Sequence, residues 1–283
     1  MPRLRAALAV TLLAPVLAAA SPLTAEVTVS HVANAGFLLA AGESRVLVDA
    51  LFDEGIDGYG RIPAALRPAL EGGSSPFDGV DVALATHAHG DHFAAGAVVR
   101  FLTANPRAWF VSTPQAVEAV AAEAGAGSAI AARAIAVLPE EGSVERLQVG
   151  DLAGIGIRAM NLHHGRGQDT QNVGFLVNLG GVTVLHVGDT VASTEELAAL
   201  DMGHVDLALL TSWVISARAW GKPLIDALGA PRVAAMHLAT ADAPASFFSE
   251  PGGQPALVQS ILRVAPTAEV FTAPLQSMTC CEK

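Results

Sequence analysis

The chain has 283 residues, of which 52% are hydrophobic, and a formal net charge of −11. This length and composition suit one large domain, or two pseudo-repeats, with a sizeable core. Lysine occurs only at Lys222 and Lys283, and no basic patch of the kind that binds phosphates is visible. The composition therefore argues against a nucleic-acid partner, but it is compatible with a small anionic substrate held by metal ions and one Arg.

Residues 1–20 have the features of a bacterial secretory signal peptide. Two Arg residues precede an apolar stretch at 6–20, and small residues allow cleavage before Ser21 or after Ala25. The stretch is short for a membrane span and Pro15 interrupts it, which makes an uncleaved anchor the weaker interpretation. We expect a periplasmic or secreted protein with no stable membrane association after cleavage.

Three short strands are predicted next, at 27–30, 36–40 and 45–49, because β-prone residues alternate there with turn sequences. The following residues, 51–79, are rich in Gly and Pro and show no clear periodicity. A connection of this length is usually functional or flexible.

Three aromatic residues lie within this connection, namely Phe52, Tyr59 and Phe77. They allow two interpretations. The connection either lines or covers an apolar pocket next to the strand that follows, or its aromatic side chains pin a surface loop to the sheet.

The next segment, residues 86–92, reads Thr-His-Ala-His-Gly-Asp-His and follows an apolar, β-prone run at 80–85. Four side chains that can bind a metal fall within six residues: His87, His89, Asp91 and His92. Neutral imidazoles and carboxylates are ligands for zinc-like cations. An extended backbone points the first two His to the same side, and Gly90 allows a turn before a helical stretch. Metal binding explains this cluster better than packing does.

Strand and helix patterns continue to the end of the chain. Helices are predicted at 94–104, 114–123, 194–200, 222–229 and 255–264, and strands at 144–148, 154–162, 173–179, 182–187, 205–210, 232–236 and 268–271. Residues 124–135 are expected to form a loop and a further helix or strand. Strand pairs with helices between them favour mixed sheets covered by helices. With no long linker, we expect one domain over residues 26–277.

The heptapeptide resembles the HxHxDH signature of the metallo-β-lactamase superfamily, and the resemblance extends over residues 26–275. Later strand ends carry further candidates in the order of that family: His163-His164-Gly165, Gly188-Asp189-Thr190 and His237-Leu238. The resemblance implies an α/β fold, a four-layer αββα sandwich of two mixed sheets flanked by helices.

The resemblance also implies a site with two divalent metal ions, with Zn2+ as the first choice and Mn2+ or Fe2+ as alternatives. The implied metal ligands are His87, His89, Asp91, His92, His164, Asp189 and His237. In this scheme the first ion takes His87, His89 and one of His163 or His164. The second takes Asp91, His92 and His237, and Asp189 bridges the two.

Several residues keep more than one interpretation. A ligand in this family usually precedes Gly or Ser at the turn, which favours His164 and leaves His163 next to the substrate. Asp49 is either a support of the metal site, as the resemblance implies, or a capping residue. His186 is expected to pack or to support a ligand. His31 is expected to be structural, and His204 to lie at the surface.

The implied activity is hydrolysis of a small ester, lactone, amide or phosphodiester by a metal-bridged hydroxide. Asp91 would be the catalytic residue that orients this hydroxide or relays its proton. His89 stands where the flavodiiron branch carries Glu, and Asp189 stands where the commonest zinc β-lactamases carry Cys. Both departures favour a general hydrolase with a small-molecule substrate. The segment at 31–37 resembles the branch related to ascorbate-6-phosphate lactonase.

Two alternatives stay open, namely a non-catalytic metal-binding protein on the same fold and a β-lactamase. The only cysteines, Cys280 and Cys281, are adjacent and are not spaced as a disulfide framework. We expect them in an exposed tail, or in an intermolecular disulfide.

Overall fold

Two seven-stranded sheets form the centre of the protein in the computed structural model, which describes residues 26–165, 169–217, 219–248 and 251–280. The predicted signal peptide lies outside the described residues. The first sheet has the order β14-β1-β2-β3-β4-β5-β6. Its strands are β1 (Val27–Ala33), β2 (Gly36–Ala41), β3 (Ser44–Val48), β4 (Val82–Leu84), β5 (Trp109–Ser112), β6 (Ala134–Ala136) and β14 (Ser277–Cys280).

The second sheet repeats this arrangement with the order β13-β12-β11-β10-β9-β8-β7. Its strands are β7 (Val144–Arg146), β8 (Ile155–Asn161), β9 (Val173–Leu179), β10 (Val182–His186), β11 (Leu207–Thr211), β12 (Arg232–Met236) and β13 (Glu269–Val270). In each sheet one half is antiparallel and the other half is parallel. Both sheets are therefore mixed, as predicted.

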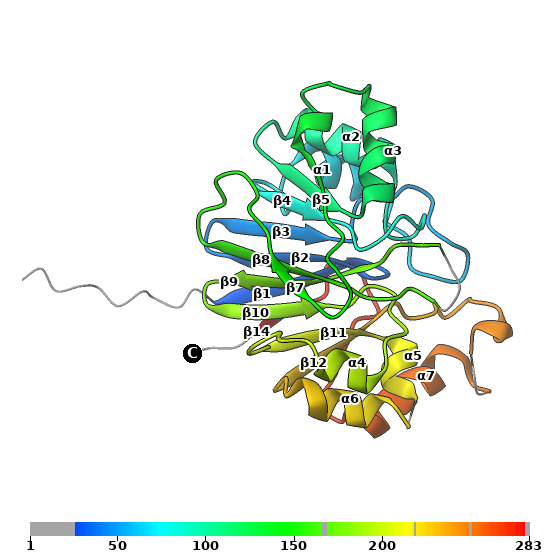
Figure 1. Ribbon diagram of the computed structural model, residues 1–283. Coiled ribbons are helices and arrows are strands. Elements are labelled where there is room, and N and C mark those ends of the chain that lie inside the picture. Colours follow the sequence, from blue (N-terminus) through cyan, green and yellow to red (C-terminus); the bar gives the residue numbers. More distant parts are fainter. Residues whose placement is uncertain (1–25, 166–168, 218, 249–250, 281–283) are drawn as a thin grey trace, which may run out of the picture.

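Helices cover the outer face of each sheet (Figure 1). The first sheet carries α1 (Arg67–Gly72), α2 (Ala95–Ala104), α3 (Pro114–Ala124) and the short helix η1 (Ala131–Arg133). The second carries α4 (Thr194–Ala198), α5 (Ser212–Ser216), α6 (Gly221–Leu228) and α7 (Gly253–Val264), and η2 (Ala245–Phe247) precedes α7. The predicted αββα sandwich is confirmed.

The alternation of side chains along the strands explains the layers. In β3, Val46 and Val48 belong to the core between the two sheets, whereas Leu47 between them belongs to the core under α2 and α3. In β4, Val82 and Leu84 likewise face the other sheet. Because successive side chains of a strand point to opposite faces, a continuous apolar run is what a sheet covered on both faces requires.

In the irregular parts of the chain one expectation was wrong, and one of two open interpretations is favoured for Phe52 and Phe77. Cys280 is not in an exposed tail, since it is fully buried and pairs with Val27 at the edge of the first sheet. Cys281 lies outside the described residues. Phe52 and Phe77 do not border an open pocket, because both are fully buried in the core under the first helices.

None of the helices in the described part of the chain combines the length and hydrophobicity that a membrane-spanning helix needs.

Candidate metal centre

The heptapeptide forms a tight loop between β4 and α2. The carbonyl oxygen of His89 accepts hydrogen bonds from the backbone N–H groups of His92 and Phe93, at 3.0 and 2.9 Å. This single helical turn brings Asp91 and His92 back towards the strand end. Gly90 is not needed for its flexibility, since it has no positive φ and a Cβ there would meet nothing within 4 Å.

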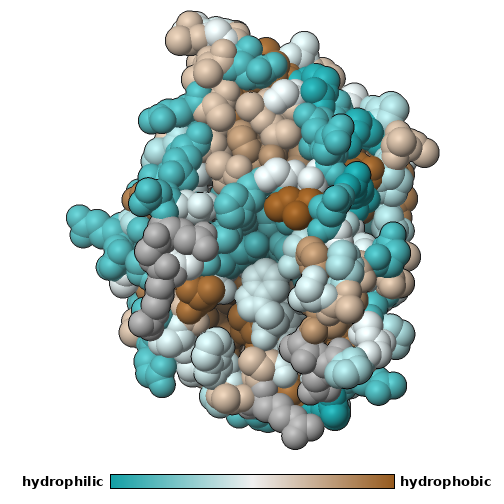
Figure 2. All heavy atoms as spheres, turned by 90° about the vertical axis from the view of Figure 1, so that its right-hand side faces the viewer, coloured by the Kyte–Doolittle hydropathy of each residue, from teal (hydrophilic) through white to brown (hydrophobic). Residues whose placement is uncertain are grey.

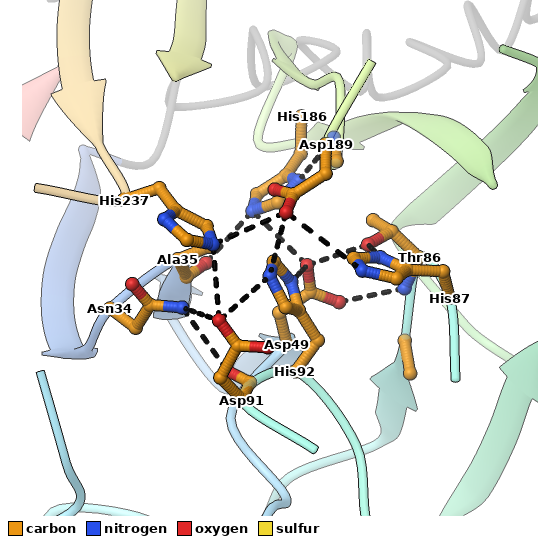
Figure 3. A network of polar contacts seen from close by, with 12 residues as sticks. Asn34, Ala35, Asp49, Thr86, His87, Asp91, His92, His186, Asp189 and His237 are labelled. Carbon is orange, nitrogen blue, oxygen red and sulfur yellow. Dashed lines mark hydrogen bonds and ion pairs between the residues drawn. The ribbon is translucent and has the colours of Figure 1, made fainter. Parts of the chain in front are cut away.

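Asp49, at the end of β3, is the support of this loop (Figure 3). Its fully buried carboxylate accepts hydrogen bonds from the backbone N–H and the hydroxyl of Thr86 and from Nδ1 of His92, each at 2.7 Å. A carboxylate only accepts hydrogen bonds, so His92 must carry its proton on Nδ1. When the ring is neutral, its other nitrogen, Nε2, presents a lone pair to the centre.

The same chain of hydrogen bonds orients His87. Because the Thr86 hydroxyl donates to Asp49, its oxygen accepts from Nδ1 of His87, which lies 3.0 Å away. His87 Nε2 is left with a lone pair, is buried, and has no hydrogen-bond partner among the described residues. A buried polar atom without a partner is costly, and a bound cation removes that cost.

Asp189 reaches the centre from the loop after β10. The preceding Gly188 has φ +59°, and a Cβ at that position would lie 2.2 Å from Oδ1 of Asn172. Only glycine permits this close approach. Asn172 Oδ1 in turn accepts from the backbone N–H of Asp189 at 3.2 Å, which fixes the start of the loop.

His237 follows β12 and has an unusual backbone, with φ +56°. Its N–H donates to the carbonyl oxygen of Asn34 at 3.2 Å, and its carbonyl oxygen accepts from the Ser212 hydroxyl at 2.8 Å. These bonds hold a strained conformation that turns the imidazole inwards.

Asp189 lies at the middle of the assembled side chains. Its Oδ2 is 3.9 Å from Nε2 of His87, 3.4 Å from Nε2 of His92, 3.8 Å from Nε2 of His164 and 3.2 Å from Nε2 of His237. Asp91 Oδ2 is 3.1 Å from Nε2 of His237. Figure 3 shows the carboxylates of Asp91 and Asp189 and the imidazoles of His87, His92 and His237 pointing towards one another.

Three overlapping groups of side chains could each hold a metal ion. They are His87 with His89 and His164, Asp91 with His92 and His237, and His87 with His92 and Asp189. The first two correspond to the two ligand sets implied by the resemblance, and the third joins them through Asp189. All seven predicted site residues are thus brought together, while their role as ligands stays a prediction.

The electrostatics of the centre act on its groups in two ways. Burial lowers the pKa of His92 and of His237, but the charge of Asp189 outweighs it and raises both, so a cation that binds there displaces their protons. The remaining groups are already in the form that binds cations. Burial, followed by the nearby His92, lowers the pKa of His87 well below its usual value and keeps that ring neutral. Burial raises the pKa of Asp189, but the charges of His92 and His237 outweigh this and hold the pKa well below its usual range. Burial also raises the pKa of Asp91. The hydrogen bond to His237 outweighs burial, so the pKa of Asp91 is lowered as well.

The other histidines are not members of the candidate ligand set, although His186 Nε2 lies 3.8 Å from the Asp49 carboxylate. His163 is half exposed, with Nε2 3.6 Å from Glu141. His186 is buried, with Nε2 donating to the carbonyl oxygen of Ala35 and Nδ1 accepting from Gly188. His31 contacts two backbone carbonyl oxygens, and His204 pairs with Asp206 at the surface.

Sequence reasoning missed two residues that shape the centre. The buried amide of Asn34 donates to Oδ2 of Asp91 at 3.0 Å and so orients this carboxylate. The Trp213 ring packs edge-on against His237, with centroids 4.9 Å apart. Asn34 lies in the segment at 31–37 used for the resemblance, which was the one available signal, whereas nothing in the sequence pointed to Trp213.

These residues fit divalent cations. The donors are imidazole nitrogens and carboxylate oxygens, which suit zinc and related ions. The unpartnered Nε2 of His87 and the shared carboxylate of Asp189 lie where such ions would be held.

A family model described as a beta-lactamase superfamily domain matches residues 44–243, the greater part of the chain. The chain belongs to the metallo-β-lactamase superfamily. The superfamily predicted from the heptapeptide is therefore confirmed. The matched residues contain all seven predicted ligands and their supporting residue Asp49.

Several solved structures share this fold. The chain is similar to a metallo hydrolase from the hyperthermophilic archaeon Ignicoccus hospitalis, with 18% identity over 91% of this chain and 100% of that one and a TM-score of 0.61. It is also similar to an isothiocyanate hydrolase from Delia radicum gut bacteria, with 17% identity over 89% and 98% of the two chains and a TM-score of 0.58.

A diiron β-hydroxylase from Streptomyces venezuelae gives 18% identity over 90% of this chain and 54% of that one, with a TM-score of 0.56. At these identities the likeness establishes the fold alone, and the fold carries more than one chemistry. A comparison with curated protein sequences finds no relative of this chain.

Proposed function

We propose that this protein is a metal-dependent hydrolase of a small ester, lactone, amide or phosphodiester. The observation that carries the proposal is the position of Asp189 between two groups of three metal-capable side chains. A carboxylate shared in this way is suited to holding two ions side by side. Zn2+ is the first choice of metal, with Mn2+ and Fe2+ as alternatives.

When bound, such ions lower the pKa of coordinated water and polarise the oxygen of the bond to be cleaved. The residues of the chain supply position and proton transfer. Asp91 stays a carboxylate because His237 and His92 lower its pKa, and Asn34 fixes its Oδ2. This carboxylate can accept a proton and return it to the leaving group.

The surface around the centre is compatible with a small substrate. Figure 2 shows a hollow lined by hydrophilic residues near the middle of the face that lies at the right of Figure 1, with hydrophobic residues beside it. The Tyr59 ring packs edge-on against His237 at 4.2 Å and so borders the space over the centre. Burial and the charges of Asp189 and Asp91 raise the pKa of this phenol, which therefore keeps its proton.

We also propose that the protein acts in the periplasm or outside the cell, on the strength of the basic and apolar residues 1–20. The mature amino terminus of the exported protein, read by mass spectrometry, tests this directly. A start at Ser21 or Glu26 supports cleavage, and an uncut chain in the membrane fraction contradicts it.

The test of activity begins with the purified protein and its metal content. The substrate panel contains aryl esters, lactones, amides, a phosphodiester and a chromogenic β-lactam, with an alkyl isothiocyanate added because of the structural neighbour. Hydrolysis that is lost in His87→Ala and kept in His204→Ala supports the proposal, because only the first residue belongs to the centre.

Metal bound without any hydrolysis would favour the non-catalytic alternative, and a closed tetrahedral site would support that alternative further. Turnover of the β-lactam alone would favour a β-lactamase. A protein that binds no divalent metal would overturn all three functions.

A further inference from the structure

A second cavity adjoins the metal centre and has a different character. It has a volume of about 700 Å3 and lies between the segment that follows β10 and the helices α5 and α6. Its walls are largely apolar and include Val191, Ala192, Trp213, Trp220, Pro223 and Leu224. We call it the Trp pocket.

Two walls of the Trp pocket are also walls of the metal centre. Thr190 lines the pocket and directly follows Asp189 in the chain. Trp213 lines the pocket and packs edge-on against His237. The Trp pocket therefore lies next to the two candidate ligands Asp189 and His237.

The Trp pocket leaves large hydrophobic side chains in contact with water. Trp220 is 65% exposed and Val191 is 45% exposed. Trp220 is held in place by the helix it precedes, since Gly221 packs so closely on α5 that a Cβ would lie 2.3 Å from the carbonyl oxygen of Ile215. Apolar area exposed at the rim of a cavity favours an apolar occupant, because covering it removes it from water.

The charge of the residues that line the Trp pocket also favours an apolar occupant. Among the described lining residues, Glu195 carries the only charge, and it is exposed. A negative rim disfavours a phosphate or carboxylate in this cavity, and the aromatic rings offer stacking area instead. The occupant best matched to these walls is an uncharged aryl or alkyl group.

We propose that the Trp pocket binds an apolar substituent of the substrate and so selects molecules with an aryl group or a chain of several carbons next to the cleaved bond. This inference rests on the proposed function, because it places the reactive bond at the metal centre. Trp220 and Val191 are then specificity-determining residues that touch only the substituent.

The experiment measures binding without turnover. The metal-loaded protein is titrated with straight-chain carboxylates from acetate to octanoate, whose head group can occupy the metal centre, and the dissociation constant is read by calorimetry. In the wild type we expect affinity to rise about three- to fourfold for each methylene group that enters the pocket.

Two variants and a control locate the effect. Trp220→Ala and Val191→Ser should flatten the dependence on chain length and leave the affinity for acetate unchanged. Leu262→Ala is the matched control, since Leu262 is also exposed, at 38%, but lies on α7 outside the pocket lining. It should keep the wild-type dependence.

The inference is overturned if affinity is independent of chain length in the wild type, or if both variants keep the full dependence. Failure of the proposed function would look different. If affinity depended on chain length but no substrate were hydrolysed, the proposed hydrolase activity would be contradicted and the role of the Trp pocket would stand. If substrates were hydrolysed with no preference for apolar substituents, the hydrolase would stand and the role of the Trp pocket would be contradicted.

Discussion

The two halves of the chain contribute to the metal centre in different ways. The first half supplies four candidate ligands from one loop of seven residues, which Asp49 holds through three short hydrogen bonds. The second half supplies one candidate from each of three separate loops, namely His164, Asp189 and His237. Each of these is placed by its own neighbours, as Asp189 is by Gly188 and Asn172.

This difference has a mechanical consequence. In the first half a single change in the loop or under it disturbs several ligands together. In the second half a change removes one ligand and leaves the other loops in place. The following predictions test this contrast, beginning with the largest expected effect.

His87→Ala should have the most severe effect on activity. His87 belongs to two of the three metal-capable groups and faces Asp189. We expect the loss of the ion held by His87, His89 and His164 and a fall in kcat/KM of more than about 100-fold, beyond what removal of an indirect partner costs. Metal analysis and kinetics of the variant provide the measurement. Full metal content with near-normal turnover would show that His87 is not a metal ligand.

His164→Ala should cause a smaller, partial loss. His164 appears in one metal-capable group, so the group around Asp91, His92 and His237 should retain its ion. His163→Ala is the matched control, because that side chain is half exposed and faces Glu141. We expect about half of the bound metal to be lost in the first variant and none in the second. The reverse result would show that His163 is the metal ligand and that His164 is not.

Asp49→Asn tests whether one residue supports the whole loop of the first half. The amide cannot accept all three hydrogen bonds and places a donor against one of them. We expect metal affinity about 10–100-fold weaker and a free energy of unfolding about 1–3 kcal/mol lower. Chelator competition and urea denaturation measure the two effects. If neither changed, the heptapeptide would hold its shape without Asp49.

The same contrast explains how much could be predicted from the sequence. The heptapeptide is local, so its composition and spacing were sufficient to indicate a metal site and the superfamily. Asp189 and His237 could be proposed only from their order along the chain. Their geometry depends on contacts with Asn172 and Asn34 in other segments of the chain, and the sequence gives no sign of which residues these are paired with.

Elements formed by long-range pairing were the hardest to predict. β14 is only four residues long and exists because it pairs with β1 at the other end of the chain. α5 is five residues long and follows β11 directly, so its sequence cannot be told from a continuation of that strand. By contrast, long and regular segments such as β8, β9 and α7 lie close to their predicted positions.

Tyr59→Ala should have the smallest effect, and it tests the residues between the two halves. Tyr59 belongs to the first half of the chain, yet its ring contacts His237 at 4.2 Å and Phe247 at 5.2 Å. Its backbone pairs with Ala239, and the neighbouring Gly58 accepts from the N–H of Thr240, so the segment stays anchored without the ring. The ring itself therefore adds apolar surface over the centre.

We expect Tyr59→Ala to raise KM by about two- to tenfold, the range that an aromatic contact supplies, with kcat and Tm nearly unchanged. Tyr59→Phe keeps the ring and should keep the wild-type KM unless the phenol hydroxyl contacts the substrate. A lower Tm with an unchanged KM would instead show that the ring pins the segment, as Phe52 and Phe77 do. Because the backbone anchors remain in both variants, the two roles separate cleanly in steady-state kinetics and thermal denaturation.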